Sequence, residues 1–168
     1  MAKNKADRTP KRMNKMIRCI RTNSGNLDFQ NLVRELDADL SIRDGEDHAF
    51  YAQFNKIDTI KYSVVALDDG KAVGCGALKE YSPGTAEVKR MYVLQDWRGL
   101  GIASLILNQL ELWAIELNYT KCILETGLKQ PEAIALYKKN GYTITPNYGQ
   151  YIDVTNSVCF EKVLTKGE

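Results

Sequence analysis

Two glycines that follow an arginine mark the stretch of this chain with the clearest capacity for chemistry. Gly99 and Gly101 come after Arg98, where the apolar strand-like run 86–93 gives way to a helical pattern that begins at Ile102. Glycine lets the backbone approach a ligand closely, and the first turn of a helix presents N–H groups that lack intrahelical partners at the positive end of the helix dipole. The spacing therefore predicts a phosphate-binding turn.

This turn differs from two common phosphate-binding motifs. Ser104 stands where a dinucleotide-binding fingerprint needs its third glycine, and no Lys-Ser/Thr pair follows Gly101 as it would in a P-loop. The strands expected before the turn also form an antiparallel meander. The pattern thus favours a phosphate-bearing ligand held mostly by backbone amides, in the middle of a mixed sheet.

The strands that must position the turn follow from the apolar pattern. They are expected at 16–21, 62–67, 71–78, 86–93, 121–125, 142–145 and 157–163. The sequence Asp68-Asp69-Gly70 predicts a tight hairpin between the second and third of these. The run 121–125 comes after a helical crossover, so we expect it to lie parallel to 86–93.

Apolar residues at helical spacing predict four helices, at 27–40, 48–54, 102–117 and 131–140. On the third helix, Leu105 and Leu112 are expected to widen the buried stripe, and Glu111 is expected to face solvent. Together these elements predict an α+β fold, with a mixed, mostly antiparallel central sheet of about six or seven strands flanked by about four helices.

The composition is that of one domain, expected over 16–168, behind a basic tail at 1–15. The chain has 168 residues, of which 44% are hydrophobic and 26% are charged, and its formal net charge is +2. The tail lacks aromatic residues, so we expect a solvated leader and no nucleic-acid partner. No apolar run approaches the roughly 20 residues of a membrane-spanning helix, which favours a cytoplasmic protein with no membrane partner. The four cysteines lack the paired spacing of a zinc site, and no metal is expected.

The glycine turn resembles a signature of a known family. Arg98-Gly99-Leu100-Gly101-Ile102-Ala103 is similar to the acetyl-CoA signature Gln/Arg-x-x-Gly-x-Gly/Ala of the GNAT superfamily of N-acetyltransferases. The stretch 133–142 resembles the family's second signature, a helix with a tyrosine before a Gly-Tyr end, and the element order over about 16–163 is similar too. Gln95 and Gln130 stand where the family usually has proline and asparagine.

The resemblance implies that acetyl-CoA is the cosubstrate. Backbone amides from Arg98 to Ser104 would hold the pyrophosphate, and the strand edge at 91–93 would pair with the pantetheine arm like an added strand. The implied cofactor-binding residues are Met91, Tyr92, Val93, Arg98, Gly99, Leu100, Gly101, Ile102, Ala103, Ser104 and Gln130.

The resemblance also implies direct acetyl transfer to a primary amine in a ternary complex, without an enzyme nucleophile. Tyr137 is expected to protonate the departing thiolate, since a phenol at the family's position has a pKa near 10 and a thiol about 8.5. Glu87 or Glu125 is expected to act as the base, directly or through water, with Glu87 favoured. The alternative for Tyr137 is an aromatic ring that only packs on a helix face, and the alternative for Glu87 and Glu125 is that each carboxylate faces solvent.

The acceptor is a small-molecule or peptide amine whose identity the sequence does not disclose. His48 and Tyr51, after the first expected helix, and Tyr148 and Tyr151, in the loop 146–151, are candidate walls of its site; a solvated turn and a surface loop are the alternatives. A catalytically silent CoA-binding sensor is the alternative function, and the chain is expected to be a monomer or a homodimer.

Overall fold

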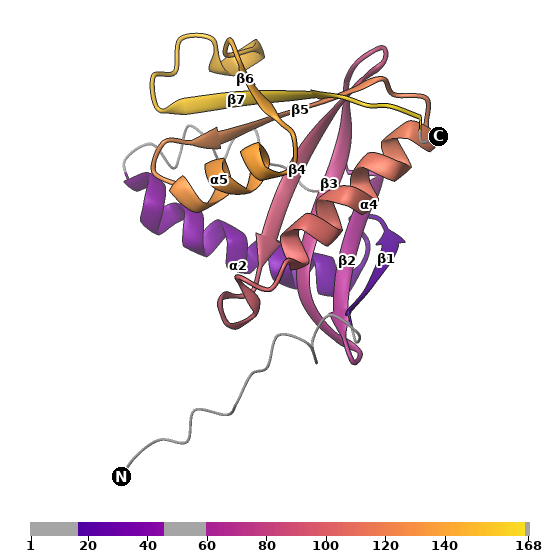
Figure 1. Cartoon of the computed structure of the whole chain (residues 1–168). Helices are drawn as coiled ribbons and strands as arrows, with labels where there is room; N and C mark the ends of the chain where they lie inside the picture. Colours follow the sequence, from indigo (N-terminus) through magenta and orange to yellow (C-terminus); the bar gives the residue numbers. More distant parts are fainter. Residues whose placement is uncertain (1–16, 46–59, 167–168) are drawn as a thin grey trace.

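A computed structural model describes residues 17–45 and 60–166, and within them the chain forms one seven-stranded sheet with helices on both faces (Figure 1). The strands are β1 (Ile17–Thr22), β2 (Tyr62–Asp68), β3 (Lys71–Ser82), β4 (Thr85–Val93), β5 (Lys121–Gly127), β6 (Thr143–Thr145) and β7 (Ser157–Val163). The α-helices are α2 (Leu27–Asp44), α4 (Ile102–Glu116) and α5 (Pro131–Lys139), and two 3-10 turns are η2 (Gln95–Trp97) and η3 (Gly149–Tyr151). The expected α+β class is confirmed.

The described part of the chain contains three of the four expected α-helices. The helix expected at 48–54 lies outside the described residues, as does the tail expected at 1–15. None of the helices in the described ranges combines the length and apolarity needed to cross a membrane.

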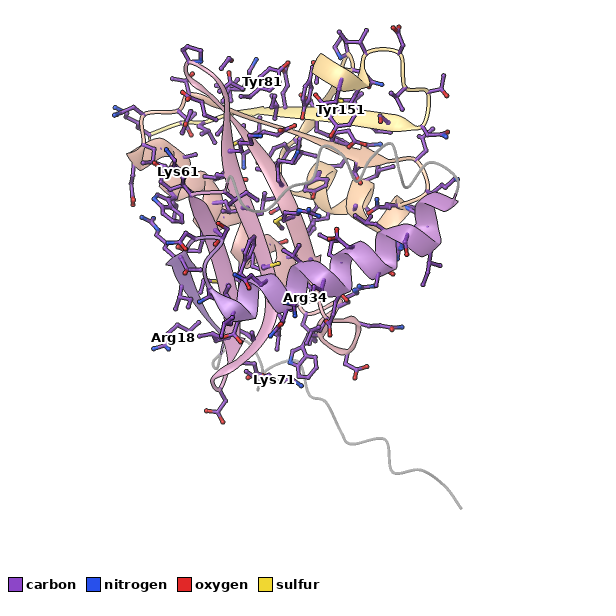
Figure 2. All side chains as sticks on the ribbon, turned by 180° about the vertical axis from the view of Figure 1, so that it is seen from behind. Arg18, Arg34, Lys61, Lys71, Tyr81 and Tyr151 are labelled. Carbon is purple, nitrogen blue, oxygen red and sulfur yellow. The ribbon has the colours of Figure 1, made fainter. Side chains whose placement is uncertain are left out.

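The sheet has the strand order β1-β2-β3-β4-β5-β7-β6. Every neighbouring pair is antiparallel except β4 and β5, which are parallel, as the helical crossover predicts. Helices α4 and α5 lie on one face of the sheet and α2 lies on the other (Figures 1 and 2). The one parallel junction therefore lies near the middle of the sheet.

Each face of the sheet buries its own apolar core. Alternate residues of β2 divide between the two cores, with Val64 facing α4 and Val65 facing α2, and both are fully buried. A strand covered on both faces shows a continuous apolar run, which explains the unbroken pattern at 62–67. Asn26 is the N-cap of α2, and its side chain accepts a hydrogen bond from the Phe29 amide (2.9 Å).

The buried face of α4 differs from the expected stripe. Leu105 and Leu112 are 40% and 45% exposed, whereas Glu111 is only 8% exposed. The Glu111 carboxylate accepts hydrogen bonds from the Tyr142 hydroxyl (3.1 Å) and the Lys162 amine (2.7 Å). Since α4 is apolar around most of its circumference, periodicity alone could not identify the face, and these two polar partners make the burial of Glu111 possible.

Candidate active site

The central strands separate soon after they pair. The parallel β4–β5 pairing covers only Thr85–Glu87 against Lys121–Ile123. Beyond Glu87, β4 continues to Val93 with β3 on one side and no described strand on the other. The backbone edge of 88–93 therefore borders a gap in the sheet, beyond the point where two parallel strands diverge.

A β-bulge changes the direction of the side chains along β4. Lys89 lies opposite Ala77 and Tyr92 lies opposite Cys75, so that Arg90 and Met91 together oppose Gly76. The Arg90 backbone has a positive φ of 59°. Before the bulge, the even-numbered residues Ala86 and Val88 face the α4 core, but after it the odd-numbered Met91 and Val93 do so.

The bulge turns Arg90 and Tyr92 toward α2. Arg90 donates a hydrogen bond to Asp37 of α2 (2.7 Å), and Tyr92 packs against the core beneath that helix. By strand alternation, Glu87 and Lys89 face the same way. The face of Glu87, which the alternating pattern alone left open, is thus settled by the register.

The turn from β4 to α4 is anchored by Arg98. Its Nε donates to the Val93 carbonyl (2.8 Å), its guanidinium lies 5.4 Å from the centre of the Tyr92 ring, and its Nη2 lies 3.9 Å from an Asp39 oxygen on α2. Arg98 therefore holds the turn against β4 and α2 at the same time.

The two glycines of the turn both need a conformation that other residues rarely adopt. Gly99 has φ +77° and Gly101 has φ +81°, and Gly101 is the N-cap of α4. A β-carbon at either position would meet no atom within 4 Å. The space before the first turn of α4 is thus open to an anion.

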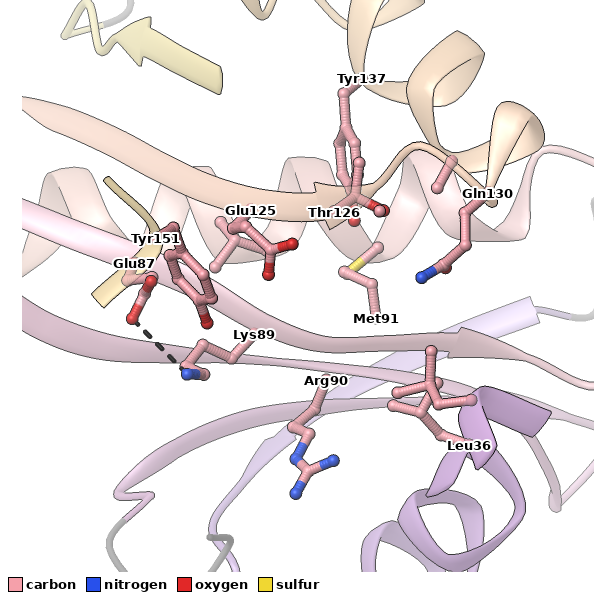
Figure 3. A pocket seen from close by; sticks show the side chains of 14 residues that line it. Leu36, Glu87, Lys89, Arg90, Met91, Glu125, Thr126, Gln130, Tyr137 and Tyr151 are labelled. Carbon is pink, nitrogen blue, oxygen red and sulfur yellow. Dashed lines mark ion pairs between the residues drawn. The ribbon is translucent and has the colours of Figure 1, made fainter. Parts of the chain in front are cut away.

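A cavity of about 400 Å³ lies between this turn, α2 and α5. All the predicted cofactor-binding residues line it except Leu100. A second cavity, of about 120 Å³, lies in the gap between β4 and β5 (Figure 3). The two cavities share five lining residues: Leu36, Met91, Gln130, Ala133 and Tyr137.

Tyr137 stands where the two cavities meet. Helix α5 carries it, and its ring packs against Tyr142 and Phe160, with both ring centres 5.9 Å away. Burial, aided by the negative charge of Glu125, raises the pKa of the Tyr137 phenol above its ordinary value of 10.0. The phenol therefore keeps its proton at neutral pH and can act as a proton donor.

Glu87 lines the smaller cavity and is held by two neighbours. The Tyr148 hydroxyl donates a 2.6 Å hydrogen bond to Oε2, and the Lys89 amine lies 3.7 Å from Oε1. Burial and then the charge of Glu87 raise the pKa of Tyr148, so the phenol stays a donor. Burial lowers the pKa of the Lys89 amine, which the charge of Glu87 opposes.

Glu125 and Tyr151 also line the smaller cavity, and Figure 3 shows them at the same end as Glu87 and Lys89. Tyr148 packs edge-on to Tyr151 (5.8 Å between ring centres) and to Tyr81 (5.1 Å). The structure thus brings Tyr151 to the cavity wall and Tyr148 to Glu87. His48 and Tyr51 lie outside the described residues.

Several residues of the site were missed by pattern reasoning. Gly76 offered one signal, because an isolated glycine inside a strand indicates a bulge or a close approach. Lys89 and Asp37 offered none, since a charged residue on a strand or a helix is ordinarily solvated. Asn140, whose side-chain amide donates to the Ser104 hydroxyl (3.1 Å), links the end of α5 to the glycine turn across 36 residues.

The sequence model of the Acetyltransferase (GNAT) family matches residues 29–142, which include the glycine turn, the gap and Tyr137. The chain belongs to this family. This chain is 37% identical to an IAA acetyltransferase of Azospirillum brasilense over 102 residues. The matched residues make up 60% of this chain and 67% of the Azospirillum brasilense protein. These matches identify the protein as an acyltransferase.

Solved structures share the fold. A Klebsiella pneumoniae protein assigned to the acyl-CoA N-acyltransferases aligns with a TM-score of 0.75 at 28% identity, over 89% of this chain and 99% of that chain. A Bacillus anthracis protein assigned to the streptothricin acetyltransferases, in complex with acetyl coenzyme A, aligns with a TM-score of 0.56 at 22% identity, over 63% and 64%. The second likeness is one of fold alone. In the described ranges of this GNAT protein, no three His, Cys, Asp or Glu side chains are grouped to hold a metal ion.

Proposed function

We propose that this GNAT enzyme moves the acetyl group of acetyl-CoA directly to a primary amine on a small molecule or a peptide. The observation that carries the proposal is the meeting of two cavities at Tyr137, one against the glycine turn and one against Glu87 and Glu125. The first suits a donor that carries phosphate, and the second suits an acceptor that carries an amine. The acetyl coenzyme A in the Bacillus anthracis neighbour supports the identity of the donor.

The donor would lie in the larger cavity. Backbone amides between Arg98 and Ser104 would bind the pyrophosphate, because they lie at the positive end of α4 and no side chain of Gly99 or Gly101 blocks them. The edge of 91–93 would pair with the amides of the pantetheine arm, and Gln130 lies at the junction to add a contact.

The chemistry needs three events, and the chain has a group for each. The amine nitrogen bonds to the thioester carbonyl carbon while the carbon–sulfur bond breaks, and a backbone N–H near the bulge at 90–92 would polarise the carbonyl. Tyr137 gives its proton to the departing thiolate. The proton that the amine loses goes to Glu87 or Glu125, directly or through water.

The two carboxylates differ in their surroundings. Glu87 is 7% exposed and is held by the hydrogen bond from Tyr148 and the ion pair with Lys89, which keep its position fixed at the end of the cavity. Glu125 lies on the facing strand β5. A carboxylate so fixed suits the orientation of an incoming ammonium or of a bridging water, and Glu87 is therefore our favoured base.

The test is release of free thiol from acetyl-CoA over a panel of small amines and peptide amines. We expect at least one amine to be acetylated, with kcat lowered 10²- to 10⁴-fold in Glu87→Gln if Glu87 is the base, and less in Glu125→Gln. Equal loss in both variants would contradict the favoured assignment. Binding of acetyl-CoA without transfer to any amine would contradict the proposed function and indicate a CoA sensor.

A further inference from the structure

The shared wall of the two cavities shows where a transferred acyl group would lie, if the proposed function holds. A donor in the larger cavity and an acceptor in the smaller one can meet only at their junction. Three of the five junction residues are apolar: Leu36 from α2, Met91 from β4 and Ala133 from α5. The site of the acyl chain is therefore closed by side chains that can exclude a longer chain by their size alone.

Among the junction residues, Met91 packs its sulfur against the backbone of a glycine, Gly76. The bulge at Arg90 places Met91 on the α4 face, with its sulfur beside Gly76 of β3. A β-carbon at Gly76 would lie 2.5 Å from the Met91 sulfur, 2.8 Å from a methyl of Leu110 and 2.9 Å from a methyl of Ile106. Such distances are too short for any real side chain. Gly76 is thus required so that the Met91 thioether can lie back against α4.

Removal of the Met91 side chain would open a defined space behind the junction. That space is bounded by the bare backbone of Gly76 and by Ile106 and Leu110, both of which are fully buried. It is apolar, so it would accept additional methylene groups and would stay dry. In Figure 3 the Met91 side chain points from β4 into the gap, beside Tyr137 and Gln130.

We propose that Met91 is the residue that limits the length of the acyl group, and that Gly76 sets the depth of the pocket by letting Met91 lie back. With both residues in place, the junction fits a two-carbon acyl group. A pocket that rejects one methylene by size commonly discriminates by about 10- to 200-fold. This inference names the residues that would select acetyl-CoA over longer acyl-CoA donors, and it rests on the proposed function.

The experiment is calorimetric titration of CoA, acetyl-CoA, propionyl-CoA and butyryl-CoA into the purified full chain and its variants. Each acyl-CoA affinity is divided by the CoA affinity of the same variant, which removes changes at the pyrophosphate and pantetheine contacts. For the wild type, we expect the ratio to be highest for acetyl-CoA and at least tenfold lower for butyryl-CoA. Met91→Ala should raise the butyryl-to-acetyl ratio at least tenfold.

Two further variants make the test specific. Met91→Leu conserves volume and should keep the wild-type order of affinities. Gly76→Ala should act in the opposite direction to Met91→Ala, because its methyl group forces the thioether toward the junction and lowers the affinity for every acyl-CoA relative to CoA. Met91→Val, which suits a strand, serves as a second enlarging variant if Met91→Ala fails to fold.

The outcomes separate the two proposals. If the wild type does not bind acetyl-CoA, the proposed function fails. If the wild type binds acetyl-CoA but binds butyryl-CoA equally well, the role of Met91 is overturned while the proposed function stands. The same holds if both Met91→Ala and Met91→Val keep the wild-type ratio.

Discussion

Substitution of Gly101 by glutamate tests the glycine turn most directly. Gly101 has φ +81° and caps α4, and its missing β-carbon would point into open space in the larger cavity. A side chain there costs about 1–2 kcal/mol of folding free energy for the left-handed backbone alone. Gly70, in the β2–β3 hairpin, has φ +84° and also has nothing within 4 Å of a β-carbon. Gly70→Glu is therefore a control with a similar strain and the same added charge, at a residue that does not line the cavity.

The two variants should separate strongly in their affinity for CoA. In Gly101→Glu the new carboxylate would lie near the pyrophosphate, and two like charges about 4 Å apart repel by about 4 kcal/mol at an effective dielectric constant of 20. That free energy corresponds to a roughly thousandfold increase in Kd. Gly70→Glu should lose much less affinity, because Gly70 does not line the cavity and an exposed charge there is screened by solvent and salt.

Calorimetric titration with CoA measures both affinities, and thermal unfolding of each variant without ligand measures the strain. We expect similar losses of stability in the two variants and a loss of affinity in Gly101→Glu alone. The assignment of the glycine turn to the pyrophosphate is refuted if Gly101→Glu binds CoA as the wild type does. It is also refuted if Gly70→Glu loses as much affinity, since strain would then explain the effect.

Three other variants test the catalytic phenol, the buried ion pair and the buried thiols. Tyr137→Phe should lower kcat by about 10²- to 10⁴-fold and leave the affinity for acetyl-CoA nearly intact, whereas steady-state kinetics that show equal losses in both would indicate a packing role. Lys162→Met should lower the free energy of unfolding in urea by about 2–3 kcal/mol, because it leaves the buried Glu111 carboxylate without its cation. The double variant Lys162→Met/Glu111→Leu should recover at least half of that loss. A Lys162→Met variant as stable as the wild type would contradict this role of the ion pair. Burial raises the pKa of the Cys75 thiol from 9.0 to about 12, so the native state holds a proton that the unfolded chain releases and the free energy of unfolding should fall as the pH rises from 9 to 12. Cys75→Ala should make that fall shallower by up to about 1.4 kcal/mol per pH unit, and an unchanged slope would show that the thiol does not titrate in this way.

The sequence predicted the elements of the fold well, because its strands and helices differ in apolar period and in their turn residues. The hairpin at Asp68-Asp69-Gly70, the parallel placement of β5 and the helix start after Gly101 all agree with the structure. Each of these features depends on residues close together in the chain, where local propensity and the handedness of crossovers leave few choices.

The parts that the sequence did not predict depend on contacts between distant residues. The Tyr148 hydroxyl reaches Glu87 across 61 residues, and no periodicity relates them. The bulge at Arg90 uses a positive φ at a residue that rarely adopts one, so its own identity gave no signal. Glu111 was wrongly expected to face solvent, because its burial depends on Lys162 and Tyr142, which the helix pattern does not contain.

The short pairing between β4 and β5 joins two halves of the sheet that follow one another in the sequence. Residues 17–117 contain β1 to β4 with α2 and α4, and residues 121–163 contain β5 to β7 with α5, so each half of the sheet is local in sequence. The halves meet through the backbone pairs at Thr85–Glu87 and through side-chain bonds such as Lys162 to Glu111 and Asn140 to Ser104. They also share the apolar core beneath α4, to which Leu124, Tyr137 and Phe160 of the second half contribute. Only three residues of β4 pair with β5, so the amides of 88–93 that border the gap should exchange with solvent by a local opening that leaves both halves intact. A ligand bound at the junction would then slow exchange in both halves at once, although it touches only their shared boundary.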